Sequence, residues 1–135
     1  MAHRIQRVNE EIRKELARIL PQLKDPRIPS LVSITAVETT GCLPYHMIEP
    51  MLPLLDTVLM DIKHVNSLKH EEFTGMRNEL ILQNAKRISE SGTHLVIRVP
   101  TIPGFNDTEE EIRGIAKFAK SLPGVNEIHL LPYHR

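Results

Sequence analysis

Polar side chains that could do chemistry follow four apolar stretches, each at the point where a predicted strand ends. They are Glu38 and Thr39, Asp61 and Lys63, Arg98, and His134. In parallel βα proteins ligands bind at the carboxyl ends of the strands, so we expect these groups to converge on one rim. Two carboxylates, an ammonium, a guanidinium and an imidazole would together bind a charged small molecule through ion pairs and hydrogen bonds.

The apolar pattern predicts the elements that position these residues. Strands are predicted at 31–37, 58–62, 95–99 and 128–131, where aliphatic and β-branched residues dominate. Helical segments are predicted after Pro44, at 66–73, over 78–91 and from Asp107 onward, with Glu110 completing a start that resembles a capping box. This alternation favours an α/β protein with a four-stranded parallel sheet, arranged as half of a (β/α) barrel.

The first thirty residues differ in composition from the rest of the chain. Their apolar residues recur at three- and four-residue spacings and predict an N-terminal amphipathic helix: Ile5, Val8, Ile12, Leu16, Ile19 and Leu23. Seven Lys and Arg stand against four Asp and Glu in this segment, whereas the whole chain has no net charge. A solvated helix face explains this local excess better than an RNA-binding surface does.

Composition limits the chemistry and the location. Cys42 is the one cysteine among 135 residues, which excludes an intrachain disulfide and an iron–sulfur site built only from this chain's thiolates. No run of about 18 apolar residues occurs, so no membrane span is expected. The polar N-terminus has no signal-peptide core, and we expect a cytoplasmic protein.

Six stretches after residue 36 carry a family resemblance. They are Val37–Gly41 (VETTG), Val58–His64 (VLMDIKH), Asn78–Leu82 (NELIL), Ile97–Pro100 (IRVP), Ile102–Asp107 (IPGFND) and Leu130–His134 (LLPYH). In order and spacing, residues 36–135 resemble the C-terminal half of the activating enzymes of glycyl-radical enzymes, the family of pyruvate formate-lyase activase. The resemblance implies a partial (β/α) barrel and radical S-adenosylmethionine (SAM) chemistry. In that chemistry a 4Fe-4S cluster on a CxxxCxxC loop cleaves SAM, and the resulting radical takes hydrogen from a glycine of the partner enzyme.

The resemblance also implies roles for the residues at the strand ends. Those expected to line the SAM pocket are Lys63, Arg98 and His134. Those expected to hold a monovalent cation beside the SAM carboxylate are Glu38, Thr39 and Asp61, with the backbone carbonyl of Leu59. The family pattern has Asp where Glu38 stands, so the carboxylate is shifted by one methylene.

The chain departs from the family because it contains no CxxxCxxC motif. Since the cluster supplies the electron that cleaves SAM, we expect no 4Fe-4S cluster and no activity from this chain alone. The leading hypothesis is therefore an incomplete activase-like fragment that retains weak binding of SAM or another nucleoside.

Residues 1–38 resemble the opening of a different family. The similar stretches are 4–12 (RIQRVNEEI), 23–27 (LKDPR) and 31–38 (LVSITAVE), and the family is that of ribosome-binding factor A. The overlap of the two resemblances at residues 34–38 predicts a chimera, natural or engineered, that folds as one unit.

Two further function hypotheses remain open on the sequence. One is binding of ribosomal RNA through the N-terminal segment, against which the neutral total charge argues. The other is a chimera whose only property is folding. Half of a barrel also leaves exposed sheet edges, which predict a homodimer or domain exchange.

Overall fold

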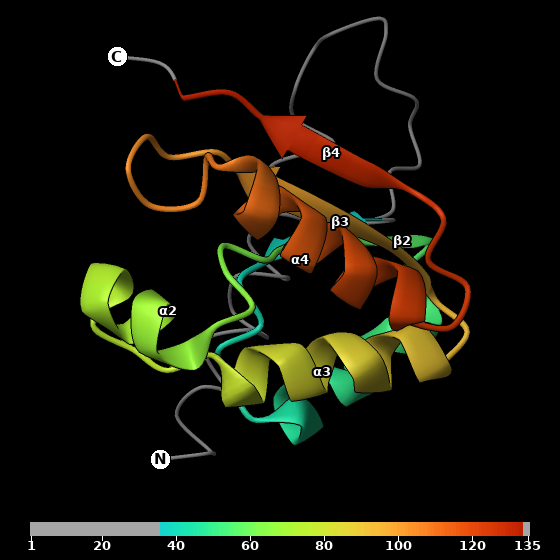
Figure 1. Ribbon diagram of the computed structural model, residues 1–135. Helices are drawn as coiled ribbons and strands as arrows, with labels where there is room; N and C mark the ends of the chain where they lie inside the picture. Colours follow the sequence, from blue (N-terminus) through green and yellow to red (C-terminus); the bar gives the residue numbers. More distant parts are fainter. Residues whose placement is uncertain (1–35, 134–135) are drawn as a thin grey trace, which may run out of the picture. The chain divides into compact units, whose positions relative to one another are not determined.

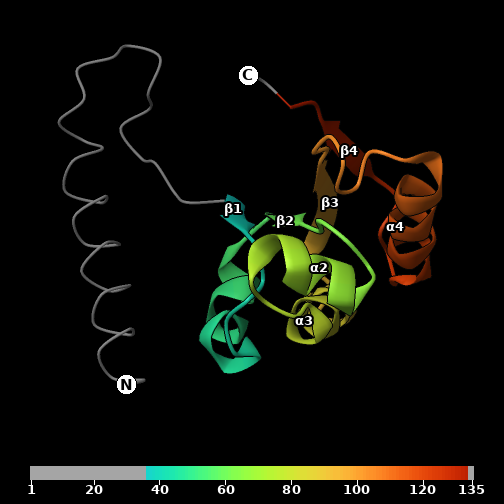
Figure 2. The ribbon, with the colours of Figure 1, turned by 60° about the vertical axis from the view of Figure 1, so that its left-hand side comes forward.

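The structure is a computed structural model that describes residues 36–133 (Figures 1 and 2). In this part the strands are β1 (Ala36–Thr39), β2 (Thr57–Asp61), β3 (His94–Pro100) and β4 (Ile128–Leu131). They form one sheet in the order β1-β2-β3-β4, and every neighbouring pair is parallel. Figure 2 shows the four labelled strands side by side in this order. The predicted α/β fold with a four-stranded parallel sheet is confirmed.

Helical segments connect the strands. They are the 3-10 segments η2 (Tyr45–Met47) and η3 (Glu49–Leu54), and the α-helices α2 (Ser67–Thr74), α3 (Glu79–Glu90) and α4 (Glu109–Ser121). Because each connection returns the chain to the same end of the sheet, all four strands end at one edge, where the βα loops gather (Figure 1).

The hydrophobic core lies between the sheet and the helices α3 and α4. Alternate strand residues supply one side of it, including Val58, Met60 and Ile97, and the helices supply the other side through residues such as Ala85 and Ile115. All five of these side chains are almost completely buried. The period of two in the strands therefore leaves the intervening residues on the opposite face of the sheet.

Helix α4 begins one residue later than the sequence predicted. The N-cap is Thr108, whose hydroxyl accepts a hydrogen bond from the backbone N–H of Glu111, while the Glu111 carboxylate reaches back to Thr108. Asp107 instead accepts a hydrogen bond from the backbone N–H of Gly104 in the preceding turn. The capping box is thus Thr108 with Glu111, and the prediction of Asp107 with Glu110 was wrong because Asp107 is used by the turn.

The helix predicted after Pro44 is present only as the two 3-10 segments η2 and η3. Pro50 and Pro53 lie within η3 and have no backbone N–H to donate, so a regular α-helical ladder cannot form there.

Several predictions fall outside residues 36–133. They concern the N-terminal amphipathic helix, the residues of the first strand before Ala36, and His134. The resemblance to ribosome-binding factor A and the chimera hypothesis depend on the same N-terminal segment and stay predictions. Among the described residues, none of the helices is long and apolar enough to cross a membrane.

Candidate functional site

Three charged side chains meet on the sheet face that lies opposite the core. Asp61 on β2 is the register partner of Arg98 on β3, so the two side chains project from adjacent positions. Glu38 on β1 is the register partner of Leu59, two residues before Asp61, and therefore shares the same face. The predicted convergence of strand-end residues holds for these three.

Arg98 lies at the centre of the group and binds both carboxylates. Its Nη2 is 2.8 Å from Asp61 Oδ1, and its Nε donates to the same oxygen at 2.9 Å. Its Nη1 is 2.9 Å from Glu38 Oε1. The side chains of Arg98 and Asp61 are only 16% and 17% exposed, whereas that of Glu38 is 64% exposed. We call these three residues the Arg98 cluster.

The environment of Arg98 acts on its pKa in two directions. Partial burial favours the neutral form, but hydrogen bonds from the guanidinium to Asp61 and Glu38 outweigh that effect and raise the pKa of Arg98 above its ordinary value. Arg98 is therefore a fixed positive charge between two carboxylates, and it can pair with an incoming carboxylate at any physiological pH.

Lys63 lies two residues beyond the end of β2 and is half-buried. Its ammonium makes no ion pair within residues 36–133. The backbone of Lys63 is held by Asn106, whose amide nitrogen donates to the carbonyl oxygens of Lys63 at 2.7 Å and of Pro100 at 2.9 Å. The side-chain oxygen of Asn106 accepts from the backbone N–H of Ile102 at 2.7 Å.

Asn106 is completely buried, and its three hydrogen bonds join the chain after β2 to the chain after β3. It therefore fixes the rim beside the Arg98 cluster. In the sequence this amide was only part of the stretch Ile102–Asp107 and was not singled out. No sequence signal marks it, because its burial and its bonds to loop carbonyls depend on how the chain after β2 meets the chain after β3.

Thr39 is separated from the other two residues predicted to hold a cation. It follows Glu38 in an extended strand, so its side chain points to the opposite face, where its hydroxyl accepts from the backbone N–H of Gly41 at 3.0 Å.

The guanidinium of Arg98 already binds both carboxylates, so an oxygen cage for a hard cation is not assembled in this arrangement. Nowhere between residues 36 and 133 do three His, Cys, Asp or Glu side chains gather in a way that could hold a metal ion. The monovalent cation stays a prediction.

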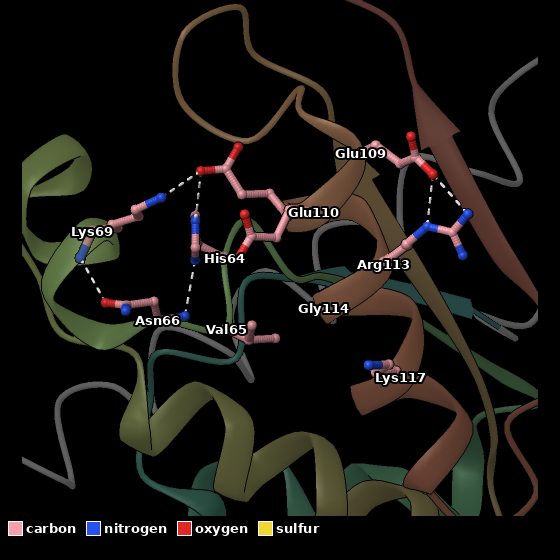
Figure 3. Close-up of a pocket in the computed structure, with 10 residues that line it drawn as sticks. His64, Val65, Asn66, Lys69, Glu109, Glu110, Arg113, Gly114 and Lys117 are labelled. Carbon is pink, nitrogen blue, oxygen red and sulfur yellow. Dashed lines mark hydrogen bonds and ion pairs between the residues drawn. The ribbon is translucent and has the colours of Figure 1, made fainter.

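A second polar region lies between the first turns of α2 and α4 (Figure 3). It is an open cleft of about 670 Å³, with His64, Lys69 and Glu111 along it. Glu111 Oε1 is 2.8 Å from Lys69 Nζ and 3.5 Å from His64 Nε2. His64 Nδ1 accepts from the backbone N–H of Asn66, which leaves the proton on Nε2, facing Glu111.

Hydrogen bonds from Lys69 and Thr108 lower the pKa of Glu111 to about 2, against a smaller opposing effect of burial. Acidic and basic side chains are balanced around this cleft, so it presents no charge that would select a ligand. We interpret the contacts of Glu111 as structural: its ion pair with Lys69 links α4 to α2.

Comparison with known proteins identifies the relatives of this chain. Over 103 residues it is 50% identical to the isethionate sulfite-lyase activating enzyme of Desulfovibrio desulfuricans, and 41% identical to the 4-hydroxyphenylacetate decarboxylase activating enzyme of Clostridioides difficile. A solved domain of the pyruvate-formate lyase-activating enzyme of Bacteroides vulgatus superposes with a TM-score of 0.68 at 34% identity, covering 90% of this chain and 73% of that one. The chain belongs to the family of glycyl-radical-enzyme activating enzymes. A scan against models of protein families gave no match.

The match covers about three quarters of this chain, and the chain spans only about a third of the length of the curated activating enzymes it matches. Activating enzymes of this family use SAM and a 4Fe-4S cluster. The single cysteine of this chain, Cys42, cannot provide the several thiolates that such a cluster needs, so the residues present do not fit the cluster. They do fit the charged end of SAM, because the Arg98 cluster offers a guanidinium flanked by carboxylates.

Proposed function

We propose that this chain is the SAM-binding part of an activating enzyme and that it binds SAM weakly without cleaving it. The observation that supports this most strongly is the Arg98 cluster at the carboxyl ends of parallel strands, in a chain of this family. Ligands of parallel βα proteins bind at this edge.

The chemistry of SAM matches the groups at the rim. Its amino-acid end has a carboxylate and an ammonium. The Arg98 guanidinium and the Lys63 ammonium pair with the carboxylate, and Asp61 accepts hydrogen bonds from the ligand ammonium. His134, beyond the described residues, is proposed to bond the ribose or the adenine. When bound, SAM supplies a sulfonium that an external electron source can cleave; this chain's residues bind and orient it.

The proposal is tested by calorimetric titration of the purified chain with SAM. We expect saturable heat with a dissociation constant in the high micromolar to millimolar range, and Lys63→Ala should weaken binding about threefold to tenfold by removing one charge partner. Lys86→Ala is the matched control, because Lys86 is an exposed lysine on α3 and pairs only with Glu90 among the described residues. Absence of heat at millimolar SAM would rule the proposal out.

A further inference from the structure

We propose that Asn78 is a positioning residue for Lys63: it fixes the backbone directly after Lys63 and so directs the lysine ammonium toward the carboxylate of the ligand. Asn78 is not at a strand end but at the start of α3. This inference rests on the proposed function, since it names a residue that acts on the same site through Lys63.

The side chain of Asn78 does not serve its own helix. Asn78 is the N-cap of α3, a position where the side-chain oxygen of asparagine usually accepts a hydrogen bond from the first turn. Here it makes no capping bond, and its Oδ1 has no partner within residues 36–133. Its amide nitrogen donates instead to the backbone carbonyl of His64, and the residue is only 1% exposed. The amide of Asn78 thus holds the chain after β2.

Two successive carbonyl groups after β2 are held by buried amides. Asn106, in the turn before α4, donates to the carbonyl of Lys63, and Asn78 donates to the carbonyl of His64. Because peptide units are planar, fixing two of them in succession restricts rotation of the backbone between them. The direction in which the Lys63 side chain leaves the backbone is therefore restricted as well.

The side chain of His64 adds to this restraint. His64 is 4% exposed, and its Nδ1 accepts from the backbone N–H of Asn66 at 2.9 Å (Figure 3). Its ring lies beside that of Phe105, with 5.5 Å between the ring centroids. The residue whose carbonyl Asn78 holds is thus itself packed in place, directly after Lys63.

A restrained backbone matters for a lysine that binds a ligand. Lysine has a flexible four-carbon stem, and it loses side-chain entropy when its ammonium is held in one place. A fixed starting point for the stem reduces the ordering that binding requires. Loss of the Asn78 amide should therefore weaken the contact between the Lys63 ammonium and a carboxylate without removing either charge.

A double-mutant cycle separates positioning from a general loosening of the fold. The affinity for SAM is measured by NMR titration of the full chain, of Asn78→Ala, of Lys63→Ala and of the double variant. We expect Asn78→Ala to weaken binding about twofold to fivefold when Lys63 is present, and to leave it unchanged in the Lys63→Ala chain. Asn78→Ser, which lacks the amide but suits an N-cap, should give the same result where Asn78→Ala folds poorly. An equal loss in both backgrounds overturns the inference.

Asn84→Ala is the matched control. Asn84 is also 1% exposed, and its amide also donates to loop carbonyls, those of Gly41 at 2.8 Å and Leu43 at 2.7 Å. It holds the chain after β1, so its effect on the affinity for SAM should be the same with and without Lys63. A dependence on Lys63 as large as that of Asn78→Ala would mean that the cycle reports loosening of the fold, and this result too overturns the inference.

A measurement without ligand separates this inference from the proposed function. The NMR order parameter of the His64 backbone N–H should fall below the value of about 0.85 typical of rigid backbone in Asn78→Ala, and not in Asn84→Ala. If this fall occurs and no variant binds SAM, the proposed function fails and the hold of Asn78 on Lys63 stands. If SAM binds and the cycle shows no dependence on Lys63, the inference fails and the proposed function stands. An unchanged order parameter overturns the inference in either case.

Discussion

At the level of single residues, the Arg98 cluster was partly predictable. The sequence placed Glu38, Asp61 and Arg98 at the ends of predicted strands, and parallel topology then brings strand ends to one edge. The direct ion pairs were not predictable, because they depend on the register that sets Asp61 opposite Arg98. Sequence patterns specify which face a strand residue occupies far better than they specify its neighbour on the next strand.

Glu111 gives a pH prediction at the same scale. The pKa of its carboxyl is about 2 in the folded protein, below the ordinary 4.5. Ionised Glu111 therefore stabilises the fold above about pH 4.5, and this stabilisation is lost as the pH falls toward 2. Denaturant unfolding over this range should show a smaller loss of stability in Glu111→Gln than in the unmodified chain.

The control for that measurement is Glu110→Gln, on the preceding and exposed residue of α4. It should keep the pH dependence of the unmodified chain, because Glu110 makes no hydrogen bond within the described residues. An unchanged pH dependence in Glu111→Gln would show that the contacts with Lys69 and His64 do not tie α2 to α4.

At the level of secondary-structure elements, β2, β3, β4 and α3 followed the sequence closely, because buried aliphatic runs and a clear apolar stripe specify them. Helix α2 was expected near its true position, but its packing was not. Two of its apolar side chains, Leu68 and Phe73, are exposed, so it has no apolar stripe from which a packing face could be predicted. Its contact with α4 through Glu111 is polar and long-range, and neither propensity nor periodicity reports such a contact.

At the same scale, substitution of Asn106 tests what holds the chain after β2 to the chain after β3. Asn106→Ala removes three hydrogen bonds and leaves the carbonyl groups of Lys63 and Pro100 without their partner. We expect a loss of about 2–4 kcal/mol in the free energy of unfolding. Asn126→Ala, on an exposed loop residue, should change it by less than about 0.5 kcal/mol. Equal effects of the two substitutions would contradict the role given to Asn106.

At the level of the whole molecule, the chain combines the fold of its family with a single cysteine. The described fold is that of an activating-enzyme domain, yet the chain has one cysteine and spans about a third of its curated relatives. In the described part, β1 and β4 are the outer strands of the sheet. Pairing of these edges in a homodimer stays a prediction, as does binding of ribosomal RNA by the N-terminal segment.

The single cysteine predicts the outcome of iron–sulfur reconstitution. After incubation of the chain with iron and sulfide, we expect no protein-bound cluster and no visible charge-transfer absorption, because Cys42 alone cannot replace a set of thiolates. Cys42→Ala should give the same spectrum as the unmodified chain. A cluster that forms only when Cys42 is present would contradict the proposal that this chain is inactive alone.

The proposed function depends above all on Arg98, which is expected to bind the carboxylate of SAM. The most direct measurement follows the Nε–H signal of Arg98 by NMR while SAM is added to the chain. We expect a saturable shift of this signal with SAM and no such shift with 5′-methylthioadenosine, which lacks the carboxylate. An Arg98 signal that stays in place at millimolar SAM would contradict it.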